Sequence, residues 1–145
     1  MRRLAAVVLL VALAGCYGGS SGPTPGDMVD VLGALTANGA TMTDTIAGDA
    51  GCNDQTLVDN ARRLTLSFAP DGKSYTVYIF RWYNNADYSE AAAAFAACVA
   101  AYQQANPGVD VQTADLSPWR AFGPAWPPAL KSAVTGALQV AAAGQ

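Results

Sequence analysis

The chain contains no histidine among its 145 residues. This absence excludes Ser-His-acid triads, Cys-His nucleophile pairs and metal sites built on imidazole. Its two lysines, Lys73 and Lys131, do not fall in the Ser-x-x-Lys spacing that would supply a catalytic base. Phosphate-binding loops and dinucleotide-binding glycine motifs are also missing. An enzyme of this sequence would have to work through carboxylates, and the sequence predicts no cofactor and no metal.

Long hydrophobic runs are scarce, and the one at the amino terminus has a distinctive form. Arg2 and Arg3 precede an apolar run from Leu4 to Ala14, which is too short to span a bilayer as a stable helix. The run leads into Leu13-Ala14-Gly15-Cys16, which resembles the lipobox of bacterial lipoproteins. The resemblance covers residues 1–16. It implies that residues 1–15 are a signal peptide and that the Cys16 thiol carries a diacylglyceryl group, with fatty chains such as palmitate.

A lipid on Cys16 would hold the protein on the extracytoplasmic face of the cell membrane or the outer membrane, since two acyl chains give stable anchoring. Two other interpretations of this terminus exist. A buried first helix with an ordinary cysteine would be apolar too, but a core helix should show periodic polar positions, and this run has none. Arg2-Arg3 could begin a twin-arginine signal, although the surrounding residues do not support it.

The segment after Cys16 is rich in glycine, serine and proline, which disfavour helix and strand. It predicts a flexible tether over residues 16–26 and one α+β domain over residues 27–145. Without residues 1–15 the chain would have six cations against 11 acids, a net charge of −5. A chain with this net negative charge has no basic surface to bind nucleic acid or anionic lipid head groups. The expected membrane attachment is therefore the lipid alone.

Two cysteines, Cys52 and Cys98, remain once Cys16 is lipidated. An even pair in an exported chain predicts a disulfide, because the compartment outside the cytoplasm is oxidising. The bond would close a loop with a sequence separation of 46 residues, worth about 4 kcal/mol in the chain-entropy model. The alternative is two unpaired thiols.

Hydrophobic periodicity and turn residues predict alternating helices and strands. The turn Pro70-Asp71-Gly72-Lys73 between two alternating segments indicates a β-hairpin. The predicted order is helix 28–38, strand 40–47, a short helix from Asn53 or Asp54 to about Ala61, strands 64–68 and 74–83, helix 87–104, strand 109–114 and helix 130–141.

The middle of this order is the split β-α-β arrangement of a ferredoxin-like fold, with an extra helix at each terminus. Right-handed crossovers would place both inner helices on one face of an antiparallel sheet. The two inner helices would run antiparallel and bring Cys52 close to Cys98. The predicted disulfide and the predicted topology therefore support each other.

The aromatic residues are the feature of the sequence that most suggests a binding site. In strand 74–83, Tyr78, Phe80 and Trp82 point to one face, while the other face is also largely apolar. A sheet face left open would be a ligand surface, whereas the first or last helix could instead cover it. The loop 117–128 raises the same choice, between a recognition patch for a sugar ring or peptide and lids that seal the core. The candidate ligand-binding residues are Trp82, Trp119, Arg120 and Trp126.

Carboxylates support two weaker hypotheses. Asp49 or Asp54 opposite Asp110 or Asp115 could form the acid pair of a hydrolase acting on the cell envelope. Calcium could bind oxygen ligands of Asp49, Asn53 and Asp54, but a turn and a helix N-cap need the same residues.

We therefore expect a non-enzymatic binding or interaction module displayed on the cell envelope, with an envelope protein or glycan as partner. The alternatives are a carboxylate-based cell-envelope hydrolase and a structural subunit of an envelope assembly.

Overall fold

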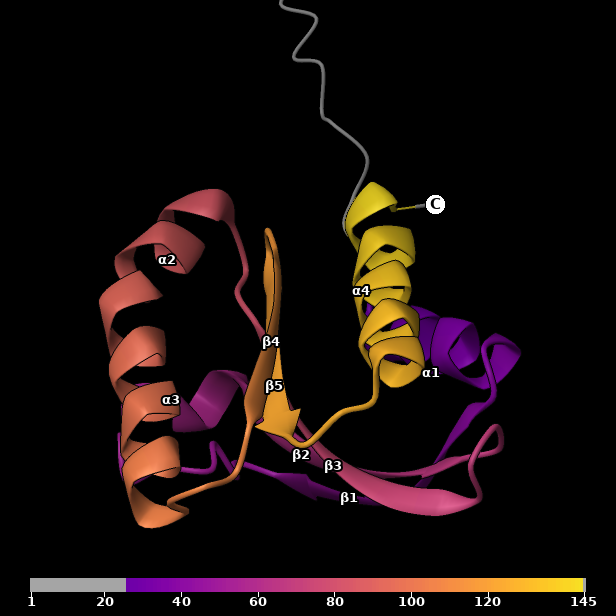
Figure 1. The fold of residues 1–145 in the computed structure, drawn as a ribbon. Helices are drawn as coiled ribbons and strands as arrows, with labels where there is room; N and C mark the ends of the chain where they lie inside the picture. Colours follow the sequence, from indigo (N-terminus) through magenta and orange to yellow (C-terminus); the bar gives the residue numbers. More distant parts are fainter. Residues whose placement is uncertain (1–25, 145) are drawn as a thin grey trace, which may run out of the picture.

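The computed structural model describes residues 26–144 and has an α+β fold (Figure 1). Helix α1 (Met28–Ala37) begins at a capping box in which Asp27 accepts from the Val29 amide and Asp30 accepts from the Asp27 amide. It ends at Asn38, and Gly39 turns the chain into β1 (Ala40–Ala47) with a φ of +80°. The predicted signal peptide, Cys16 and all of the predicted tether except Gly26 lie outside the described residues.

The sheet has five strands in the order β1-β2-β3-β5-β4, and every neighbouring pair is antiparallel. The predicted hairpin is confirmed as β2 (Ala61–Phe68) and β3 (Lys73–Arg81), joined through Gly72 with a φ of +68°. The remaining strands are β4 (Val111–Leu116) and β5 (Trp119–Pro124).

Helices cover both faces of the sheet (Figure 1). On one face, α1 and α4 (Pro128–Ala143) pack over a core that includes Leu64, Ile79 and Trp119. On the other face, α2 (Asn85–Glu90) and α3 (Ala92–Ala105) lie over a second core that includes Phe80, Phe95 and Phe122. Both apolar faces of strand β3 are therefore covered, as the interpretation with a covering terminal helix expected.

The ferredoxin-like order is not confirmed, because the segment between β1 and β2 is not a crossover helix. It contains only the 3-10 helix η1 (Val58–Asn60), and β1 pairs directly with β2. Gly48 and Gly51 hold positive φ angles of 75° and 71° in the irregular segment before the predicted helix. Asp54 accepts from the Thr56 amide within a local turn, so the capping residue is there without a helix to follow it.

The second difference is a strand inside the predicted loop 117–128. Strand β5 lies between β3 and β4 and pairs with both. Trp119 and Ala121 face the α1/α4 core, while Arg120 and Phe122 face the α2/α3 side. A short segment with apolar residues on both faces suits an interior strand. Pro118 and Pro124 lie at its ends, where they do not interrupt the ladder.

The Cys52–Cys98 disulfide is confirmed, with a Cα–Cα distance of 5.4 Å. Its geometry differs from the expected one, because Cys52 lies in the loop before η1 and not at the start of a helix. The bond ties this loop to α3. Within residues 26–144, no helix has the length and apolar character needed to cross a membrane.

Candidate functional site

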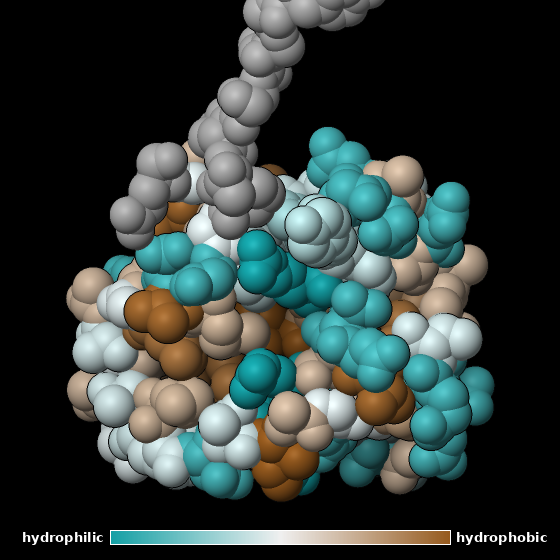
Figure 2. Space-filling model, turned by 180° about the vertical axis from the view of Figure 1, so that it is seen from behind, coloured by the Kyte–Doolittle hydropathy of each residue, from teal (hydrophilic) through white to brown (hydrophobic). Residues whose placement is uncertain are grey.

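A groove lies on the α1/α4 side of the sheet, where the strands run past the helices that cover the core. Its floor is formed by the ends of β1, β2 and β3, one wall by residues 27–29 at the start of α1, and the other by η1. We call it the strand-end groove, and its cavity has a volume of about 620 Å³. Seen from behind, the molecule is hollowed near its middle, with hydrophobic residues deep between hydrophilic ones (Figure 2).

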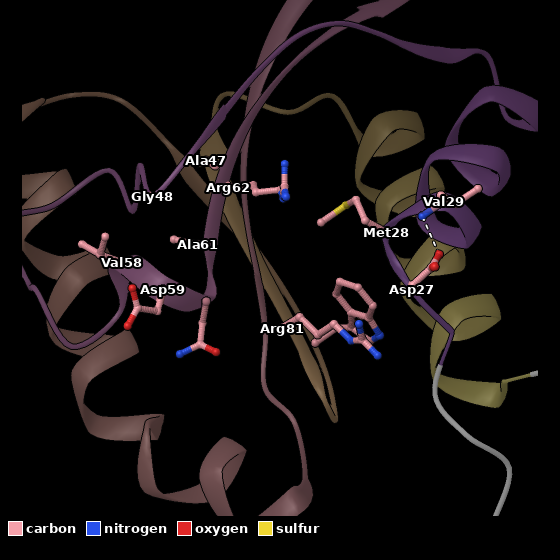
Figure 3. Close-up of a pocket in the computed structure, with 12 residues that line it drawn as sticks. Asp27, Met28, Val29, Ala47, Gly48, Val58, Asp59, Ala61, Arg62 and Arg81 are labelled. Carbon is pink, nitrogen blue, oxygen red and sulfur yellow. Dashed lines mark hydrogen bonds between the residues drawn. The ribbon is translucent and has the colours of Figure 1, made fainter.

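Two arginines on neighbouring strands supply the positive charge of the groove. Arg62 of β2 shares a strand face with Leu64, and Arg81 of β3 shares one with Ile79, so both arginines continue the α1/α4 face beyond its apolar part. Figure 3 shows them between the residues of η1 and those of α1. Neither of the two ion pairs found among residues 26–144 involves Arg62. Its guanidinium is exposed and stands at the groove.

The groove also carries acids, one on each wall. Asp27 accepts a hydrogen bond from the Val29 amide at 2.8 Å and so belongs to the helix cap (Figure 3). Asp59 lies on the opposite wall, in η1. A ligand in the groove would therefore meet cations at the floor and carboxylates at the sides.

Trp119 lines the groove and has an unmet hydrogen-bonding group. Its side chain is fully buried, and its indole Nε1 has no hydrogen-bond partner in the described part of the chain. The Arg81 guanidinium carbon lies 5.4 Å from the centre of the Trp119 ring, in cation–π range. Leaving a buried donor unpaired costs about 1–3 kcal/mol. The guanidiniums of Arg62 and Arg81 suit a ligand rich in acceptor oxygens.

The four aromatic and arginine candidates from the sequence do not form one exposed patch. Trp119 and Trp126 belong to the α1/α4 core, while Trp82 and Arg120 lie on the α2/α3 side. Their exposed fractions are 0, 4, 4 and 5%, respectively. Trp126 donates from Nε1 to the Thr76 carbonyl at 2.9 Å. This burial favours the alternative interpretation, in which these residues seal the core.

Arg120 has the most unusual surroundings of these four residues. Its guanidinium carbon lies 3.9 Å from the centre of the Tyr88 ring and 5.4 Å from the rings of Trp82 and Phe95. Its Nε lies 3.3 Å from both carboxylate oxygens of Asp115, which also accepts from the Tyr88 hydroxyl. We call Arg120, Asp115, Tyr88, Trp82 and Phe95 the Arg120 cluster. Cross-strand pairing of Asp115 with Arg120 places the two charges together.

The predicted acids serve separate local roles. Asp49 accepts from the Gly51 amide and lies 3.4 Å from Arg63, while Asp110 accepts from the Gln112 side chain. Hydrogen bonds from the Thr56 hydroxyl and amide hold the pKa of Asp54 below its usual value. Asp54 and Asp115 line two different cavities.

The calcium hypothesis gains nothing from the loop before η1, since Asp49 and Asp54 both serve turns there. The described part of the chain contains no group of three or more side chains arranged to hold a metal ion.

Sequence reasoning missed the strand-end groove, although a signal for it exists. Arg62 and Arg81 interrupt the apolar alternation of two paired strands on the same face, which marks a place where the core ends. In comparisons with protein-family models, with curated proteins and with solved structures, this chain has no match.

Proposed function

We propose that this protein is a lipid-anchored lipoprotein of the cell envelope whose domain is a non-enzymatic binding module. The anchor is supported by the lipobox-like residues 13–16 and by the glycine- and proline-rich residues that follow. A disulfide between Cys52 and Cys98 fits export, because such bonds persist in oxidising compartments. The membrane would be the cell membrane or the outer membrane, with the domain on the extracytoplasmic side.

The observation that carries the binding role is the strand-end groove. It combines a volume of about 620 Å³ with the guanidiniums of Arg62 and Arg81. Among the described residues that line it, the sole aromatic side chain is that of Trp119, which is fully buried and offers no ring face to a sugar. A protein partner fits better than a glycan, since carboxylates and backbone carbonyls are acceptors for arginine. We therefore assign the groove to a segment of an envelope protein that presents acceptor oxygens to Arg62 and Arg81.

The position of the groove fits a partner held near the membrane. Asp27, Met28 and Val29 form one wall, and Gly26 just before them is the residue at which the proposed tether ends. The Gly26 amide donates to the Ala141 carbonyl at 2.6 Å, which fixes this end of the chain on α4. The groove therefore lies at the tethered end of the domain.

Site-specific photocrosslinking in cells tests the binding role. A photoreactive residue at Val29, which is 72% exposed on the groove wall, should crosslink one defined partner. The same residue at Lys73 serves as control, because Lys73 lies at the opposite end of β3 from Arg81, about 27 Å away along the strand. Equal adducts at both positions would overturn the proposal.

A matched pair of charge variants makes the test specific. Arg62→Gln removes a groove guanidinium, and the Val29 adduct should fall about tenfold, as the loss of one charge-assisted hydrogen bond implies. Arg63→Gln removes the same charge one residue away on the opposite sheet face, where Arg63 pairs with Asp49, and should leave the adduct unchanged. An adduct that is indifferent to Arg62 would refute the groove as the binding site.

Metabolic labelling tests the anchor separately. A palmitate analogue should label the wild-type chain in the membrane fraction, and Cys16→Ser should abolish both the label and the membrane location. Labelling that survives Cys16→Ser would exclude the lipoprotein assignment.

A further inference from the structure

A second cavity lies between α3 and β4, on the sheet face opposite the strand-end groove. It has a volume of about 330 Å³, and its lining includes Phe95, Ala96, Val99, Thr113, Asp115 and Arg120. We propose that this cavity binds a small neutral molecule with an apolar body and one carbonyl or amide oxygen. The proposal does not depend on the function assigned to the groove.

Arg120 is a buried charge that packing alone does not require. The residue is 5% exposed and points to the same sheet face as Phe122. Taking a guanidinium out of water is costly, and apolar residues of similar volume often replace buried ion pairs without loss of stability. Its ion-pair partner Asp115 keeps half of its side chain in solvent, at 51% exposed. A buried arginine with one exposed partner is therefore a candidate for a binding role.

The guanidinium of Arg120 has N–H groups that lack an acceptor among the described residues. The Nε atom faces Asp115 at 3.3 Å, which is long for a charge-assisted bond. The Nη1 atom is buried and has no hydrogen-bond partner among residues 26–144. The Tyr88 ring at 3.9 Å stabilises the charge, but a ring contact does not serve the N–H groups that lie in the guanidinium plane. An acceptor oxygen from a ligand would complete the set.

The charge and the apolar lining of the cavity favour a neutral ligand. Asp115 already supplies one negative charge to Arg120 and lines the same cavity, so a second carboxylate would be repelled. A neutral carbonyl or amide oxygen meets the donor without this repulsion. Phe95, Ala96 and Val99 make the α3 wall apolar and favour an apolar body. A volume of about 330 Å³ is at the lower end of small-molecule sites, which begin at about 300 Å³.

Amide-resolved NMR of the full lipidated chain in detergent micelles tests this site with three probes of similar size. Benzamide carries the amide oxygen, benzoate carries a carboxylate, and toluene carries neither. Benzamide should shift the Ala96 and Thr113 amide signals saturably and bind about tenfold more tightly than benzoate or toluene. Equal affinity for the three probes, tighter binding of benzoate, or no saturable shift with benzamide would each overturn the proposal.

Two variants separate the cavity from its arginine. Ala96→Phe fills the cavity from the exposed face of α3 and leaves residue 120 an arginine, and should abolish benzamide binding in the same micelles. Arg120→Met keeps the volume but removes the donors, and should reduce benzamide to the affinity of toluene. Should Arg120→Met fail to fold, Ala96→Phe alone decides. Benzamide shifts that persist in Ala96→Phe would place the binding elsewhere and refute the site.

Discussion

Breaking the Cys52–Cys98 disulfide should lower the free energy of unfolding substantially. The bond closes a loop with a sequence separation of 46 residues, and the chain-entropy model gives about 4 kcal/mol for a loop of this length. Domains of this size are stable by about 5–15 kcal/mol in total. The disulfide would therefore supply a large share of the stability. Its loss should be felt most in α3, which the bond ties to the loop before η1.

Urea unfolding of the full chain with and without a thiol reductant measures this contribution. Reduction removes no heavy atom from either side chain, so it breaks the covalent link without deleting the packed sulfur of Cys98, which is 2% exposed. The double variant Cys52→Ala/Cys98→Ala is the control and should not respond to the reductant. A loss below about 1 kcal/mol on reduction of the wild type would refute the loop-entropy argument.

Two further predictions concern stability. Gly51→Ala should destabilise the fold by roughly 1–3 kcal/mol, because Gly51 has a φ of +71° and an added Cβ would lie 2.9 Å from the Tyr78 ring. Gly136→Ala is the control, because nothing lies within 4 Å of the Cβ that it adds. Alanine at this helical position should raise the free energy of unfolding by about 0.5–1 kcal/mol. Equal effects of the two variants in urea unfolding would contradict the reasoning. A hydrogen bond from the Tyr75 hydroxyl lowers the pKa of Asp71 below 3.8, so its stabilising contribution is present above pH 3.8 and is lost as the pH falls through the lowered pKa. Asp71→Asn should reduce the loss of unfolding free energy that the wild type shows as the pH falls below 3.8. An unchanged loss would show that the contact between Tyr75 and Asp71 contributes nothing to stability.

Local patterns predicted the parts of this fold that depend on local residues. The Pro70 to Lys73 turn fixes the β2–β3 hairpin, and Asp27 fixes the start of α1. The disulfide was predicted from the even count of cysteines in a chain expected to be exported, and the helix pair that was expected to bring them together does not form. Strand β5 was missed, because the six residues Trp119–Pro124 between prolines resemble a loop until their neighbours in the sheet are known.

In the candidate sites, too, local features were predictable from the sequence and features that depend on tertiary neighbours were not. Arg62 and Arg81 could be located from strand alternation alone, since both occupy apolar-face positions of paired strands. The environment of Arg120 could not be predicted, because it depends on β5 lying between β3 and β4 and on α2 bringing Tyr88 over the guanidinium. Nothing in the sequence around Tyr88 indicates a contact with a cation.

The hydrogen bond from Gly26 to Ala141 has a practical consequence for handling this protein. It brings the first described residue alongside the last turn of α4, so both ends of the domain leave from one pole (Figure 1). A fluorescent reporter fused to the end of α4 would crowd the space beside the groove wall at residues 27–29. Insertion between Asp71 and Gly72, at the exposed tip of the hairpin, would keep a reporter away from that pole.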